Sequence, residues 1–186
     1  MQRLIAAAAL AATLAGCATA PAPAHSREMP PLQLAPSALG RSLNQQQHLT
    51  LQAPGHDQQL DVLLEADAHR VQLGVLAMGQ LAARLDWDGR TLKEDKASWW
   101  PAAVSGTRIL SDLQLALWPV PAIQAALPAG WVLADSGDAR TLTQDGEVVT
   151  VVRRLGPHVV EIDQRREHFK LRIESIDFGG DAQFAD

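Results

Sequence analysis

The sequence predicts a mainly β fold with an α-helical insert, in which a curled antiparallel sheet carries two short helices as a lid. Apolar residues recur at every second position through most of the chain after residue 45, and turns containing Gly, Pro or Asp separate these runs. Residues 107–127 differ, because their apolar side chains follow helical spacing. A length of 186 residues, with 47% hydrophobic and 20% charged residues, suits one globular domain.

The first 16 residues are organised like a bacterial signal peptide. Arg3 gives a positive start, and the apolar run Leu4–Ala15 is too short to span a bilayer as a permanent helix. The run ends in Leu14-Ala15-Gly16-Cys17, which resembles the lipobox of bacterial lipoproteins. This resemblance implies cleavage before Cys17 and lipidation of Cys17 by fatty acids such as palmitate. Because Ala18 follows, it also implies an outer-membrane location, with the domain facing the periplasm. The alternative is an ordinary signal peptide that contains the single cysteine of the chain.

Residues 17–44 are expected to form a lipidated N-terminus and a Pro-rich tether. Prolines make such a segment extended and semi-rigid, and a segment of this kind does not bury a core. The folded domain is therefore expected to cover residues 45–180. The prolines of the expected tether are Pro21, Pro23, Pro30, Pro31 and Pro36.

Nine or ten short strands are expected, joined by tight turns such as Asp88–Gly89 and Asp145–Gly146. Each expected strand alternates apolar and polar residues or is rich in β-branched residues. The expected strands cover residues 49–52, 60–65, 71–75, 81–87 and 91–93 before the helical insert, and residues 131–134, 140–143, 148–153, 159–164 and 169–174 after it.

Two helices are expected between these halves. The first covers residues 107–118, where apolar residues follow helical spacing and Ser111, Asp112 and Gln114 form the polar side. Pro119 stops it, since proline disfavours helix at the residue before it. Pro121 fits the first position of a second helix over residues 122–127.

The alternation gives the predicted sheet one apolar face, which leaves two possibilities. Either the sheet closes and fills its interior, or it curls into a half-barrel with the helices over a partly empty cavity. We expect the cavity, because few aromatic residues are available to fill a barrel. The residues expected to line the cavity and its lid, and so to bind a ligand, are Leu64, Val71, Leu73, Val75, Leu85, Leu110, Leu113, Leu117, Trp118, Ile162 and Leu171.

Two adjacent tryptophans mark a candidate contact surface. Trp99 and Trp100 lie between a charged run and Pro101, and adjacent residues rarely face the same way. We expect a partly exposed hydrophobic loop here that contacts the membrane or a protein partner, whereas Trp118 and Trp131 are expected in the core.

Several function classes find no support. The net charge of −5, without a basic run, disfavours nucleic-acid binding. No two histidines have the spacing of a metal-binding pair, and one cysteine excludes a Cys-based metal cluster, so no metal is expected. Phosphate-binding, dinucleotide-binding and serine-hydrolase motifs are absent from the sequence, so we expect neither a cofactor nor an enzyme.

The whole arrangement resembles the LolA/LolB group of lipoprotein carriers, through its lipobox, Pro-rich tether, run of strands and mid-chain helical pair. That group has an open β half-barrel with a helical lid, and it holds acyl chains in an apolar cavity. Within it, LolB also inserts a hydrophobic protruding loop into the membrane, and no such loop can be placed from this sequence. The stretches Arg108–Pro119 and Leu127–Trp131 more specifically resemble an uncharacterised family of proteobacterial outer-membrane lipoproteins, often encoded beside genes for aryl-polyene and fatty-acid-type synthesis.

Two functions follow as expectations. The first is an outer-membrane lipoprotein that binds a lipid or polyene acyl chain in a LolB-like half-barrel and assists its transfer or placement. The second is a membrane-tethered docking accessory of an envelope or synthase complex, with a filled core and an envelope protein as partner.

Overall fold

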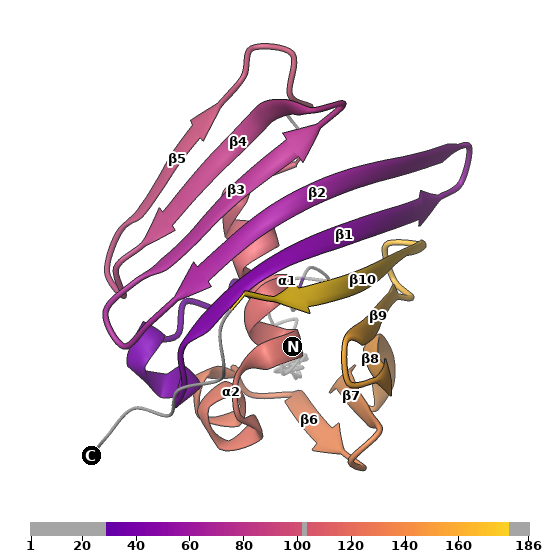
Figure 1. Ribbon diagram of the computed structural model, residues 1–186. Helices are drawn as coiled ribbons and strands as arrows, with labels where there is room; N and C mark the ends of the chain where they lie inside the picture. The colour runs from indigo at the N-terminus through magenta and orange to yellow at the C-terminus, as the bar shows by residue number, and fades with distance from the viewer. Residues whose placement is uncertain (1–28, 102–103, 179–186) are drawn as a thin grey trace, which may run out of the picture.

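The computed structural model describes residues 29–101 and 104–178, so the expected signal peptide and Cys17 lie outside the described residues. Ten strands form one antiparallel sheet in the order β5-β4-β3-β2-β1-β10-β9-β8-β7-β6 (Figure 1). The predicted mainly β fold, with one antiparallel sheet and two short helices, is confirmed. The strands are β1 (Leu43–Ala53), β2 (His56–Ala66), β3 (Val71–Ala77), β4 (Gln80–Trp87), β5 (Leu92–Lys96), β6 (Trp131–Asp135), β7 (Ala139–Gln144), β8 (Glu147–Gly156), β9 (Val159–Gln164) and β10 (Phe169–Asp177).

The sheet is open and is not strongly curled, so the predicted half-barrel curl is not observed. Its free edges are β5 and β6. A sheet must bury its apolar face against another layer, and here a helix lies on that face (Figure 1). The sheet therefore does not need to close on itself. We call this apolar side, which carries Leu64, Leu73 and Ile162, the inner face.

Both free edges are protected against pairing with another strand. Residues 93–96 of β5 are all charged. In β6, the backbone N–H of Trp131 donates to the Pro128 carbonyl at 3.2 Å, and that of Leu133 donates to Gln124 Oε1 at 2.9 Å. The edges are therefore poor sites for adding a strand from a partner.

The hairpin of β1 and β2 is longer than the sequence indicates. Its register runs from Leu43 opposite Ala66 to Ala53 opposite His56, so the strand expected over residues 49–52 begins six residues earlier. The polar run of residues 44–48 lies before the first expected strand. Nevertheless it forms a strand, because both β2 and β10 pair with its backbone, and it places Gln47 in the interior.

The two predicted helices are confirmed as α1 (Gly106–Leu117) and α2 (Val120–Ala126). Ser105 caps α1 at its N-terminus, where its hydroxyl accepts the backbone N–H of Arg108 at 3.2 Å. Pro119 follows the last turn of α1 and directly precedes α2. The expected stop signal therefore acts where the sequence places it.

Most of helix α1 is buried, and its predicted polar side does not face solvent. Its apolar residues Leu110 and Leu115 are 0% exposed, and the expected polar residues are also buried: Ser111 is 1%, Asp112 7% and Gln114 0% exposed. The reason is that α1 lies between the inner face and the segment of residues 29–39, which we call the strap. The helix is thus an interior element, with a covering layer on each side.

The strap is part of the folded domain, which corrects the expected tether for residues 29–39. Leu32 and Leu34 are buried although prolines surround them. The Leu32 N–H donates to Ser111 Oγ at 2.9 Å, and Gln114 bonds both the N–H and the carbonyl of Leu34, at 3.0 and 3.1 Å. Extended proline-rich chain exposes its backbone groups, and here buried side chains of α1 satisfy them. The strap ends in a short 3₁₀ helix, Pro36–Leu39.

Candidate functional site

The residues predicted to line a ligand cavity lie together, but they pack against each other across α1. Those on the sheet face those on the helix within one hydrophobic core, and Leu117 and Leu171 are half-buried at its margin. Leu85 and Ile162 on the sheet and Trp118 after α1 are all 0% exposed. The fully buried members are Leu64, Val71, Leu73, Val75, Leu85, Leu110, Leu113, Trp118 and Ile162.

A buried polar cluster attaches α1 to β9. Asp112 accepts hydrogen bonds from Gln164 Nε2 at 2.7 Å and from Arg108 Nε at 3.0 Å. Gln164 in turn accepts from Thr150 Oγ1 at 2.6 Å, and Arg108 also pairs with Glu167. Burial raises the pKa of Asp112 to about 6, although the charge of Arg108 opposes this shift. Asp112 is therefore the group of this cluster that titrates near neutral pH.

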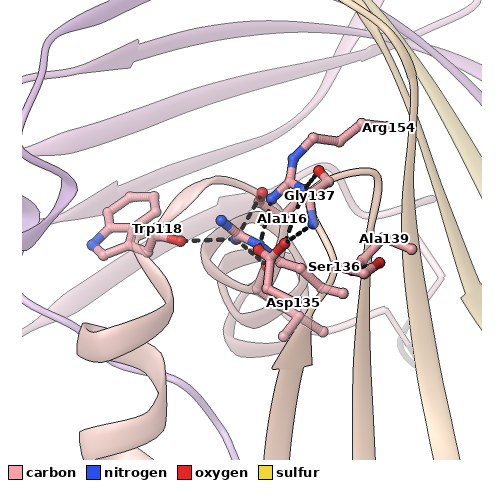
Figure 2. A network of polar contacts seen from close by, with 9 residues as sticks. Ala116, Trp118, Asp135, Ser136, Gly137, Ala139 and Arg154 are labelled. Atoms are coloured by element: carbon pink, nitrogen blue, oxygen red, sulfur yellow. Dashed lines mark hydrogen bonds and ion pairs between the residues drawn. The ribbon is translucent and has the colours of Figure 1, made fainter.

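Arg140 holds the other end of α1 (Figure 2). Its Nη1 donates to the carbonyls of Leu115, Ala116 and Trp118 at 2.9, 3.1 and 2.8 Å. These are carbonyls at the helix C-terminus, where a positive charge also interacts favourably with the helix dipole. Asp135 balances the charge, because it accepts from Arg140 Nε at 2.9 Å. Hydrogen bonds from Arg154 lower the pKa of Asp135 strongly. The network fixes α1 against β6 and β7.

Most of the chain matches the model of a known protein family. The model of the family DUF3261, described as a protein of unknown function, matches residues 44–177. The chain belongs to this family. The match runs from β1 to β10 and so includes the whole sheet and both helices, whereas the strap precedes it. No curated protein matches the chain.

Two surface concavities of this DUF3261 domain lie away from the predicted lid. One, of about 480 Å³, is open and is lined by residues 52–54 at the end of β1 and by residues 163–165 and 168–170 around the β9–β10 turn. The other, of about 260 Å³, is lined mainly by polar residues where β1, β2 and β3 meet, among them Glu65, Asp67 and Arg70. Neither is lined by α1 or α2.

The two adjacent tryptophans differ in their surroundings. Trp99 is 45% exposed, as the prediction of a partly exposed loop requires. Trp100 is only 7% exposed and its Nε1 donates to the Val104 carbonyl at 3.3 Å, so its assignment as a contact residue is wrong. The two indole rings pack edge to face with centroids 6.5 Å apart, so the buried ring of Trp100 supports the exposed ring of Trp99. Trp118 and Trp131 are buried, as expected.

Within residues 29–101 and 104–178, no group of three or more His, Cys, Asp or Glu side chains is placed to hold a metal ion. Among the same residues, no helix is both long and apolar enough to cross a membrane. Cys17, the predicted lipidation residue, lies outside the described residues.

Sequence reasoning missed the polar residues that hold α1 in place. Arg108 and Asp112 are spaced i, i+4 on one helix, which is a signal for their ion pair. Thr150 and Gln164 were also visible as polar residues at strand positions that point inward. The carbonyl partners of Arg140 gave no signal, because they are backbone groups of another element, whereas its side-chain partner Asp135 lies opposite it in the β6–β7 hairpin.

Proposed function

We propose that this DUF3261 protein is a lipid-anchored lipoprotein of the outer membrane, whose periplasmic domain is a docking module for an envelope or synthase complex. The anchor rests on the lipobox resemblance that ends at Cys17. A cysteine with several acyl chains would hold the domain on a bilayer almost permanently. The domain itself then needs to supply only a rigid surface.

The buried position of α1 is the observation that favours a docking module over an acyl-chain carrier. An acyl-chain carrier needs apolar space, and α1 occupies the inner face on which such space was expected. Releasing α1 would expose Leu110 and Leu115 to water. It would also break the bonds of Gln114 to the strap and of Asp112 to β9. A helix held on both sides in this way favours a permanent core over a moving lid.

A disulfide that fixes α1 to the strap distinguishes a docking function from the transport of an acyl chain. Cysteines are placed at Leu32 and Ser111, where the strap contacts α1 through the bond of the Leu32 N–H to Ser111 Oγ at 2.9 Å, and mass spectrometry verifies that the disulfide has formed before the variant is used. The native Cys17 would not interfere once it is acylated. A docking module should complement the envelope phenotype of a gene-deletion strain whether this disulfide is oxidised or reduced. A carrier should complement only when it is reduced, and that result would contradict the proposal.

The anchor is tested separately in cells. An alkyne fatty acid fed to a Gram-negative host should label the wild-type protein, and the label should travel with the outer-membrane fraction. The variant Cys17→Ser should carry no label and should leave that fraction. Equal membrane association of both proteins would reject the anchor.

Binding of a lipid or polyene acyl chain remains a second proposal, and a different observation favours it. Several apolar residues on the inner face are only half-buried, in the β1–β2 hairpin and in strands β9 and β10. They could hold one chain without displacing α1. Native mass spectrometry of protein extracted from membranes would show such a ligand as a stoichiometric added mass. These half-buried residues are Leu49, Leu60, Val160 and Leu171.

A further inference from the structure

One turn of the sheet carries an apolar residue in a position that suits a polar one. The β3–β4 turn is Met78–Gly79, with φ of 51° and 74°, and the β7–β8 turn is Asp145–Gly146, with φ of 51° and 85°. Both are two-residue turns with both residues left-handed, a geometry that favours Asn or Asp followed by Gly. Met78 has no such preference, and its side chain is 92% exposed. The fold therefore gains nothing from methionine at this position.

Two more exposed apolar side chains lie at the same end of the sheet. Leu81 is 50% exposed near the start of β4, and Trp99 is 45% exposed in the connection from β5 to α1. The Ala97 N–H donates to the Ala82 carbonyl at 2.9 Å, which holds the start of this connection beside the first residues of β4. Figure 1 shows the β3–β4 turn and this connection at the top of the molecule. We call Met78, Leu81 and Trp99 the apolar end.

The opposite end of the same strands is polar. The turns of residues 67–70 and 88–91 are each closed by an aspartate, whose Oδ1 accepts two backbone N–H groups. Asp67 accepts from His69 and Arg70, at 2.7 and 2.8 Å. Asp88 makes the same pair of bonds within its own turn. The β3–β4 turn and the β5–α1 connection therefore carry exposed apolar side chains at the end where the β1–β2 turn also lies, and the two turns at the opposite end are polar.

The first described residues of the strap lie on the side of the domain where α1 begins. The strap runs in the same direction as α1, because Leu32 bonds Ser111, Leu34 bonds Gln114, and Ala35 accepts from Trp118 Nε1. The start of the strap therefore lies toward the first turn of α1, which directly follows the connection that carries Trp99. The 12 steps from Cys17 to Met29 span at most roughly 40 Å when fully extended.

We propose that the apolar end rests in the interfacial region of the lipid bilayer to which Cys17 is anchored. Trp99 lies at headgroup depth, which suits an amphipathic ring, and Met78 reaches the acyl-chain boundary. The anchor raises the effective concentration of the bilayer, so three apolar side chains are sufficient. The polar turns then point into the periplasm as the free surface. This inference rests on the proposed anchor and adds the orientation of the domain.

The test couples the mature chain, beginning at Cys17, to a maleimide-headgroup lipid through its only thiol, in phosphatidylcholine vesicles with brominated acyl chains. Bromine quenches nearby tryptophan, and Trp99 is the exposed one, whereas the other four tryptophans are at most 7% exposed. We expect bromination to quench the wild type and Trp99→Phe to abolish this quenching. Met78→Asn should reduce the quenching at least two-fold. The matched control is Leu155→Asn, which is 51% exposed near the end of β8, and it should quench like the wild type.

Stability distinguishes a surface role of Met78 from a structural one. Asparagine suits the left-handed turn, so Met78→Asn should unfold at the same temperature as the wild type or higher. Absence of bromine-dependent quenching in the tethered wild type would overturn the inference. So would quenching that Trp99→Phe and Met78→Asn leave unchanged, or a Met78→Asn variant that is less stable. Because the tether is chemical, these results do not depend on acylation of Cys17 in cells.

Discussion

Replacing Gln114 by leucine tests whether the strap belongs to the folded domain. Gln114 is 0% exposed and bonds both backbone groups of Leu34. Leucine has a similar volume but forms neither bond. The substitution therefore removes the polar attachment of the strap and leaves the packing of α1 nearly unchanged.

The expected loss follows from the groups left without a partner. The Leu34 carbonyl keeps a hydrogen bond from Trp87 Nε1 at 2.8 Å, so it remains satisfied. The Leu34 N–H becomes a buried donor with no acceptor, which costs about 1–3 kcal/mol, and the lost bond to the carbonyl adds roughly 1 kcal/mol. Since the leucine side chain recovers part of this as apolar burial, we expect Gln114→Leu to lower the free energy of unfolding by about 2–3 kcal/mol.

Urea unfolding followed by tryptophan fluorescence measures this loss, because Trp87 and Trp118 both bond the strap. The matched control is Gln33→Leu, which makes the same chemical change at an exposed position of the strap and should stay within about 0.5 kcal/mol of the wild type. If Gln114→Leu proves no less stable than Gln33→Leu, the strap is not held as the structure indicates and the reasoning is refuted.

Three further substitutions probe the contacts of α1. The pKa of Asp112 rises from its ordinary 3.8 to about 6 on folding. Between these two pH values the carboxyl group is therefore protonated in the native state and ionised in the unfolded state. Stability should therefore increase as pH falls through 6, by up to about 3 kcal/mol, and be lost again as pH rises; urea midpoints for Asp112→Asn should lack this slope. Arg140→Leu removes the hydrogen bonds of three carbonyls and leaves Asp135 paired with Arg154 alone, and it should cost about 3–5 kcal/mol in urea unfolding, while Arg140→Lys should recover only part of this loss; full recovery by lysine would argue against a role for the guanidinium geometry. Gly106→Ala should lower the melting temperature although helix propensity favours alanine by about 1 kcal/mol, because an added Cβ would lie 2.5 Å from Leu85 Cδ2; a higher melting temperature would contradict this.

Local patterns in the sequence were sufficient to predict the strands and both helices. The alternation along residues 71–75 and 169–174 corresponds to β3 and β10, and Pro119 separates the helices as expected. These features depend on neighbouring residues in the chain, so a single sequence contains them. The run of residues 44–48 was missed because its strand structure comes from pairing with two other strands and not from its own side chains.

The position of α1 could not be predicted, because it depends on partners far away in the sequence. Ser111 and Gln114 have the composition of a solvent-facing side, and only the strap, about 80 residues earlier, makes them interior. A partial signal was present, since Leu32 and Leu34 alternate within the proline-rich segment. The proline content outweighed this signal, although extended chain can pack on a helix when buried side chains satisfy its backbone.

Hydrogen exchange of the α1 amides tests most directly whether the helix is a permanent part of the core. If α1 is fixed between the inner face and the strap, the amides of residues 110–117 should exchange only through global unfolding, as slowly as those of β2 and β3, with or without added fatty acid. Fast exchange confined to α1, or exchange that a fatty acid accelerates, would mean that the helix leaves the inner face, and it would contradict the account.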